Sequence, residues 1–167
     1  PENDMVASAG SGWGINVWKL ADGALVRNIP SGSDGILHLA AAHGADLVAS
    51  AGRDRAISVW NVHTGLLVRR FTLHPSPVIG MAFFPGDQIL ATAGQDGSLS
   101  LWSVSAPDPI ATLQTGEAIL NAMTLSTDGQ TLVTASASGR LNVWNFSSLL
   151  WITRPHQPGR PIPLETL

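Results

Sequence analysis

Three residues of this 167-residue chain have the side chains of a hydrolytic triad. His74, Thr92 and Asp96 would supply a base, a hydroxyl nucleophile and a carboxylate. The chain has four other histidines, at positions 38, 43, 63 and 156 (His38, His43, His63 and His156). None of them belongs to a helical pair of histidines or to a cluster of carboxylates in the sequence. A metal site needs three or four converging ligands, and the chain has no cysteine, so we expect no metal and no cofactor. What the three triad-like residues do depends on the elements that position them.

Four tryptophans divide the chain at a constant interval. Each lies 42 residues after the one before, at Trp18, Trp60, Trp102 and Trp144. A hydroxyl residue precedes each of them by ten positions, at Ser8, Ser50, Thr92 and Thr134. A period in the low forties is the length of one four-stranded propeller blade. Because the hydroxyl recurs in every unit, whereas a catalytic residue need not recur, we favour a structural role for Thr92.

Each unit has the pattern of four short strands. In the third unit they cover residues 78–84, 89–93, 98–104 and 110–113, with turns between them. These connections are too short for crossover helices, so we predict an all-β fold of antiparallel propeller blades. The predicted blades are 1–29, 30–71, 72–113 and 114–154, which together form a partial propeller over 1–154. The first blade lacks its inner strand, which leaves fifteen strands, and the proline-rich stretch 155–167 is expected to be an extended tail.

The pattern resembles the WD40 repeat family across residues 5–154. In that family an Asp, a His, a Ser or Thr and the Trp form a hydrogen-bonded tetrad within a blade. The third unit matches at all four positions, with His74, Thr92, Asp96 and Trp102. The resemblance therefore implies a structural tetrad, in which the imidazole lies between a hydroxyl and a carboxylate and fixes the turn between the second and third strands. The fourth unit has Ser138 in place of the Asp.

The turns between the second and third strands carry candidate binding residues, namely Trp13, Arg53, Arg55 and Arg140. In a propeller these turns lie on one face, and Trp and Arg are enriched at interface hot spots. We predict that this face binds a protein. The alternative is that Trp13 packs locally against a neighbouring turn.

Composition and charge narrow the classes of function. The net charge of −3 gives no basic footprint for a nucleic-acid partner. No run of about eighteen apolar residues predicts a membrane span, and no signal peptide is recognisable. We expect the cytoplasm or another soluble compartment, with the proviso that a targeting segment upstream of Pro1 would be missing from this sequence.

Three functions remain, in order of preference: a non-catalytic protein–protein interaction scaffold, a self-associating propeller fragment that completes a ring by oligomerisation, and an enzyme that uses the propeller channel. The predicted inner strands at 36–42, 78–84 and 120–126 carry His38 as their one ionisable residue, which makes the enzyme the weakest. We also predict that the chain is not a free closed monomer. Blades of a parent chain, a second copy or the tail would have to cover the open edge of the first blade.

Overall fold

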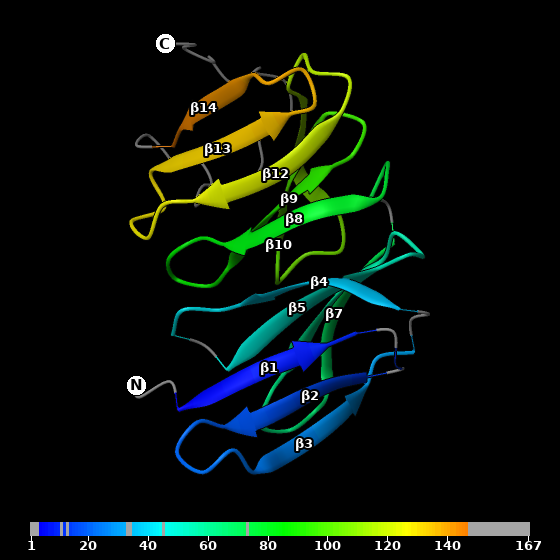
Figure 1. The fold of residues 1–167 in the computed structure, drawn as a ribbon, viewed down its shortest axis with the longest axis vertical. Coiled ribbons are helices and arrows are strands. Elements are labelled where there is room, and N and C mark those ends of the chain that lie inside the picture. Colours follow the sequence, from blue (N-terminus) through cyan, green and yellow to red (C-terminus); the bar gives the residue numbers. More distant parts are fainter. Residues whose placement is uncertain are drawn as a thin grey trace.

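The computed structural model describes residues 4–10, 12, 14–32, 35–44, 46–72 and 74–146. In this part of the chain every regular element is a β-strand. The strands form four antiparallel sheets, which follow one another along the longest axis of the molecule (Figure 1). The prediction of an all-β fold built from antiparallel blades is therefore confirmed.

Blade 1 contains three strands and blade 2 contains four. In blade 1 the strands pair in the order β1 (Met5–Ala9), β2 (Gly14–Lys19) and β3 (Leu25–Pro30). In blade 2 the order is β4 (Ile36–Ala41), β5 (Leu47–Gly52), β6 (Ile57–Asn61) and β7 (Leu67–Phe71). Comparison of the two orders shows that blade 1 begins with the equivalent of β5, so the described chain has no inner strand in blade 1.

Blade 3 repeats the four-stranded order, and three strands of blade 4 are described. Blade 3 contains β8 (Val78–Phe83), β9 (Ile89–Gly94), β10 (Ser98–Ser103) and β11 (Pro109–Gln114). Blade 4 contains β12 (Leu120–Leu125), β13 (Thr131–Ser136) and β14 (Leu141–Asn145). The fifteenth predicted strand, outermost in blade 4, and the predicted tail at 155–167 lie outside the described residues.

Adjacent blades are held together by three apolar clusters. In each cluster, third-strand side chains of one blade are joined by the repeat tryptophan of the next blade. The members are Ile15, Val17 and Trp60 between blades 1 and 2, Ile57, Val59 and Trp102 between blades 2 and 3, and Leu99, Leu101 and Trp144 between blades 3 and 4. Full burial of one such side chain stabilises the fold by about 1.5–3 kcal/mol, so each blade depends on its neighbours.

Polar contacts also join blades 2 and 3. The Asp87 carboxylate, in the turn between β8 and β9, accepts hydrogen bonds from the backbone N–H groups of His43 and Gly44, both at 2.7 Å. From β7, the Arg69 guanidinium donates to the carbonyl oxygens of Val104 and Ser105 at 3.1 and 3.2 Å. These bonds satisfy backbone groups of one blade with side chains of the other, and therefore fix how the two sheets are stacked.

The burial of a strand follows from the number of blades that flank it. The first five residues of β10 are buried, because blade 3 has a neighbour on both faces. In β14 only Trp144 is buried. Figure 1 shows why, since blades 1 and 4 lie at opposite ends of the row of sheets. The four described sheets thus form an open array.

Candidate functional site

The tryptophan of every blade donates a hydrogen bond to the hydroxyl ten residues before it. The Nε1–Oγ distances are 2.8 Å for Trp18 to Ser8, 3.0 Å for Trp60 to Ser50, 2.8 Å for Trp102 to Thr92 and 3.2 Å for Trp144 to Thr134. The second and third strands are paired so that these two positions are diagonal neighbours on one face of the sheet; in blade 3, for example, Thr92 pairs with Ser100 and Trp102 pairs with Leu90. An indole N–H needs an acceptor when it is buried, and this pairing supplies one in each blade.

His74 is buried, and its imidazole lies near the same tryptophan. The two ring centroids are 6.2 Å apart. Its Nδ1 lies 2.6 Å from the carbonyl oxygen of Ser76, so Nδ1 carries the proton and donates it. Its Nε2 is buried and has no hydrogen-bond partner among the described residues. Burial lowers the pKa of His74, and the Ser76 carbonyl and the Asp96 charge raise it by less, so the ring is neutral near pH 7.

The Asp96 carboxylate is held by serines and not by the imidazole. Its Oδ1 accepts from the hydroxyl of Ser76 at 2.7 Å and from the hydroxyl of Ser98 at 2.6 Å. The backbone N–H of Ser98 donates to the same oxygen at 3.1 Å. Burial favours a higher pKa for Asp96, but the bonds from Ser98 and Ser76 outweigh it and hold the pKa below its usual value. His74 and Asp96 are therefore linked through Ser76, which differs from the direct contact expected from the sequence.

Gly94 makes room for this serine–carboxylate network. A β-carbon added at Gly94 would collide with the hydroxyls of Ser98 and Ser76 and would lie 2.8 Å from Asp96 Oδ1. Sequence reasoning missed Ser76, Ser98 and Gly94. Ser98 carried a usable signal, because an Asp side chain in a turn often accepts a hydrogen bond from the backbone N–H two residues on, which here belongs to Ser98.

Blade 4 contains a similar hydroxyl–carboxylate hydrogen bond, but here the serine stands at the repeat position of Asp96 and the carboxylate comes from another loop. Ser138, which lies where blade 3 has Asp96, donates its hydroxyl to Glu117 Oε2 at 2.9 Å. Arg140 Nη1 lies 3.6 Å from Glu117 Oε1. The bond from Ser138 is the largest influence on Glu117 and lowers its pKa, with smaller contributions from Ser136 and Arg140 opposed by burial. The carboxylate thus comes from the loop before the inner strand, where the third repeat has Pro75, and no sequence signal pointed to it.

The predicted binding face is occupied by exposed arginines in the described turns. Arg53 and Arg55 are exposed in the turn between β5 and β6, and the Arg140 side chain is 77% exposed between β13 and β14. Within the described ranges, no hydrogen bond or ion pair engages the side chain of Arg53 or Arg55. Arg140 is partly neutralised by Glu117. Trp13, the fourth residue predicted for this face, lies outside the described residues.

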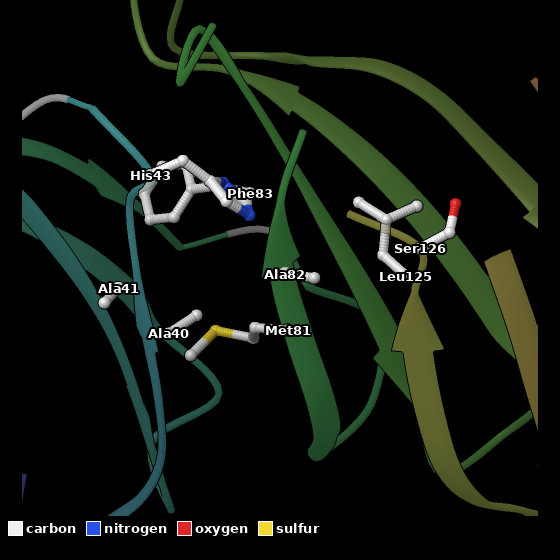
Figure 2. Close-up of a pocket in the computed structure, with 8 residues that line it drawn as sticks. All are labelled: Ala40, Ala41, His43, Met81, Ala82, Phe83, Leu125 and Ser126. Atoms are coloured by element: carbon white, nitrogen blue, oxygen red, sulfur yellow. The ribbon is translucent and has the colours of Figure 1, made fainter. Parts of the chain in front are cut away.

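The inner strands enclose an open hollow of about 210 Å³ at one end of blades 2 to 4. Figure 2 shows Met81 reaching from β8 toward Ala40 of β4, with Leu125 of β12 on the other side. The polar side chains on this hollow are His43 and Ser126. His38, the ionisable residue predicted on the inner strands, is half-buried in β4, and burial lowers its pKa. No group of three His, Asp or Glu residues suited to a metal is found among the described residues.

Comparison with known families identifies the repeat. The WD40 family (WD domain, G-beta repeat) matches residues 23–61, 65–103 and 107–145. Each match covers the last strand of one blade and the first three strands of the next. No curated protein matches the chain significantly. No helix long and apolar enough to cross a membrane occurs in the described ranges. WD40 repeats generally mediate protein–protein interactions and are typically non-catalytic. With three consecutive matches over most of its length, the chain belongs to the WD40 repeat family.

Proposed function

We propose that this chain is a non-catalytic interaction scaffold, and that its partner binds the face formed by the turns between the second and third strands. The observation that carries the proposal is the exposure of Arg53, Arg55 and Arg140 in equivalent turns of the repeat. Arginine forms charge-assisted, planar hydrogen bonds to carboxylates and is enriched at interface hot spots. Arg53 and Arg55 form no ion pair among the described residues, and these two guanidinium groups would favour an acidic segment of a protein partner.

The triad-like residues support this assignment over a catalytic one. Thr92 has no exposed surface, and its hydroxyl accepts the indole N–H of Trp102. A nucleophile must reach its substrate and must be hydrogen-bonded to its base. Thr92 is covered by neighbouring blades, and its hydroxyl is engaged with Trp102 in place of His74.

The test compares partner recovery by matched variants of the full chain. Arg53→Ala/Arg55→Ala should lose the partners that wild type recovers, and adding Trp13→Ala should deepen the loss. Lys19→Ala is the control, because Lys19 is exposed at the opposite end of β2 from the predicted face. If Arg53→Ala/Arg55→Ala recovers as much partner protein as Lys19→Ala does, this face is not the binding face.

A second function, self-association, is favoured by the two ends of the array. Leu141 and Val143 are 68% and 48% exposed in blade 4. The same positions in blade 3, Leu99 and Leu101, are 0% and 1% exposed. At the other end Val6 is 48% exposed, whereas Leu90 at its position in blade 3 is 0% exposed. The free faces of blades 1 and 4 therefore carry the two halves of an interior interface, and a head-to-tail copy would join them.

Light scattering on the purified chain tests self-association. Wild type at micromolar concentration should have at least twice the monomer mass, and Leu141→Asp should return it to one chain. Leu66→Asp is a matched control, because Leu66 is 67% exposed in the turn between β6 and β7 and is no part of an interior cluster. A monomeric wild type, or equal dissociation by both substitutions, would exclude this second function.

A further inference from the structure

The turn between the second and third strands has the same backbone geometry in blades 2, 3 and 4. In each of them one residue donates its backbone N–H to the carbonyl three positions earlier, at 3.1–3.3 Å. These residues are Arg55, Gly97 and Gly139. All three have positive φ values, which are 61°, 84° and 85° respectively. The turn therefore requires a left-handed backbone at this position, whatever the side chain is.

Blades 3 and 4 meet this requirement with glycine, and blade 2 does not. Glycine adopts a left-handed backbone without steric cost because it has no β-carbon. Arginine has a β-carbon, and it lacks the short polar side chain with which Asn and Asp hydrogen-bond locally in this conformation. The backbone of Arg55 is therefore strained, although Gly97 and Gly139 show that the same turn forms without an arginine.

One other non-glycine residue in the described ranges has a positive φ, and internal contacts explain it. Asp87 has a φ of 57°. Its carboxylate accepts the backbone N–H groups of His43 and Gly44 at 2.7 Å each. Aspartate tolerates this region of backbone space, and bonds to a charged acceptor are stronger than neutral ones. The strain at Asp87 is therefore offset by the contact between blades 2 and 3.

No such contact offsets the strain at Arg55. Its side chain is exposed, and no hydrogen bond or ion pair engages it within the described part of the chain. The neighbouring carboxylate is bound to other groups, because Asp54 lies 3.0 Å from Nη2 of Arg70 and accepts the backbone N–H of Ala56. Strained residues of this kind cluster at ligand-binding sites, and the observed strain therefore supports a binding role for Arg55.

Arg53, the second arginine of this turn, is placed differently. Its φ is not positive. Its side chain lies along Gly35, since a β-carbon added at Gly35 would be 3.6 Å from Nε and 3.9 Å from Cδ of Arg53. Arg53 thus has an unstrained backbone and a side chain that packs on its own blade. Of these two arginines, Arg55 alone combines a strained backbone with an unpaired guanidinium.

The repeat shows in which direction the Arg55 side chain leaves the turn. A β-carbon added at Gly97 would collide with the backbone carbonyl of Glu117, in the loop before the inner strand of blade 4. The equivalent loop beside Arg55 precedes β8, and its described residues include Pro75 and Pro77, both exposed. Arg55 therefore projects at the boundary between blades 2 and 3, where neither proline has an N–H to offer an anion.

We propose that Arg55 is the anchor of the arginine-bearing face, and that its guanidinium holds a carboxylate of the partner segment through two parallel hydrogen bonds. The planar fork of a guanidinium matches the two oxygens of a carboxylate, which an ammonium cannot do. This role rests on the function proposed above, and it adds which residue of the face carries recognition. The contact made in the complex offsets the backbone strain that the free chain retains.

The anchor role predicts that one substitution changes stability and affinity in opposite directions. Arg55→Gly removes the strain and the guanidinium together. Its Tm should rise by about 2–4 °C, because relief of the left-handed strain exceeds the added flexibility of the unfolded chain. Arg53→Gly is the matched control. Since the φ of Arg53 is not positive, glycine there relieves no strain, and the Tm should fall.

Fluorescence anisotropy with the full chain measures affinity. The probe is a fluorescent octapeptide of alternating glutamate and serine, and the control peptide has glutamine in place of every glutamate. Arg55→Lys is the conservative variant, because it keeps the positive charge and the β-carbon and loses the planar fork. Arg53→Ala/Arg55→Ala tests the face as a whole.

We expect wild type to bind the glutamate probe at about 100 µM and to leave the glutamine peptide free. Arg55→Gly and Arg55→Lys should each bind the probe at least about tenfold more weakly, and Arg53→Gly should lose less affinity than either. The proposal is overturned by no binding to wild type, by a lower Tm for Arg55→Gly, or by wild-type affinity in Arg55→Lys.

The variants also separate this inference from the function on which it rests. If Arg53→Ala/Arg55→Ala loses the probe while Arg55→Gly retains it, the face binds an acidic segment and Arg55 is not its anchor. If both variants retain the probe, the arginine-bearing face is not the binding face, and the proposed function fails together with the anchor.

Discussion

The Asp96 network gives the sharpest test of how this fold is stabilised. Asp96→Ala removes the acceptor of two hydroxyls and one backbone N–H. Ser98 has no exposed surface and Ser76 is 7% exposed, so water cannot readily replace the carboxylate. Each buried donor left without a partner costs about 1–3 kcal/mol. Asp96 itself lies near the surface, so water can partly replace its carboxylate as the partner of Ser76. We therefore expect Asp96→Ala to lower the free energy of unfolding by about 2–4 kcal/mol in total.

Ser138→Ala is the matched comparison in the next blade, because Ser138 occupies the same repeat position. Its side chain is exposed, and the bonds it makes to Glu117 and Ser136 are exchangeable with water. Substitutions of this kind usually change stability by no more than about 0.5 kcal/mol. The loss of stability in Asp96→Asn should lie between the losses in Asp96→Ala and Ser138→Ala, since the amide keeps an acceptor oxygen and loses the charge.

Urea unfolding followed by tryptophan fluorescence measures all three variants. The pH dependence adds an independent check. The folded-state pKa of Asp96 lies below its unfolded value, so its charged form stabilises the fold above the unfolded pKa. This contribution disappears as the pH falls through the lower, folded-state pKa. The difference in unfolding free energy between wild type and Asp96→Ala should therefore become smaller below about pH 4. Equal midpoint shifts for Asp96→Ala and Ser138→Ala, or a gap that does not change with pH, would refute the reasoning.

Three further pairs of substitutions test the contacts between and within blades. Gly97 and Gly139 have nearly the same φ values, 84° and 85°. A β-carbon added at Gly97 would collide with the carbonyl of Glu117, whereas a β-carbon added at Gly139 would meet no atom within 4 Å. Gly139→Ala should cost about 1–2 kcal/mol of unfolding free energy from the left-handed backbone alone, and Gly97→Ala clearly more. Asp87→Ala removes two charge-assisted bonds to blade 2 and should cost about 2–4 kcal/mol, with faster exchange of the Gly44 amide. Exposed Asp46→Ala is its control. Thr92→Val leaves the buried Trp102 N–H unpaired and should cost about 1–3 kcal/mol, while Ser8→Ala, near solvent, should change the urea midpoint little.

The repeat made most of the fold predictable. Trp18, Trp60, Trp102 and Trp144 fixed the register of every blade, because a constant period leaves no freedom in how strands are assigned. Alternation within each unit then identified the strands and their turns. The absence of an inner strand in blade 1 followed from counting, and the sheet order of the described chain agrees with it.

The details of the polar network could not be predicted in the same way. The residue types at His74 and Asp96 fitted a direct imidazole–carboxylate contact, yet Ser76 lies between them and bonds to each. The conformation of the loop from His74 to Ser76 places the serine between the imidazole and the carboxylate. The repeat period carries no information about the conformation of such a loop. Glu117 is a clearer case, since its partner Ser138 lies 21 positions away in another turn.

The offset between sequence repeat and blade explains why the blades cannot be separated. Each family match contributes one outer strand to a blade and three strands to the next, so the backbone crosses every interface inside a repeat. The same offset brings the tryptophan of each match onto third-strand side chains of the preceding blade. Covalent connection and apolar burial therefore act at the same three boundaries. An interior blade gains from two such boundaries and an end blade from one, which is why the exposed core-type residues, Val6, Leu141 and Val143, occur in blades 1 and 4.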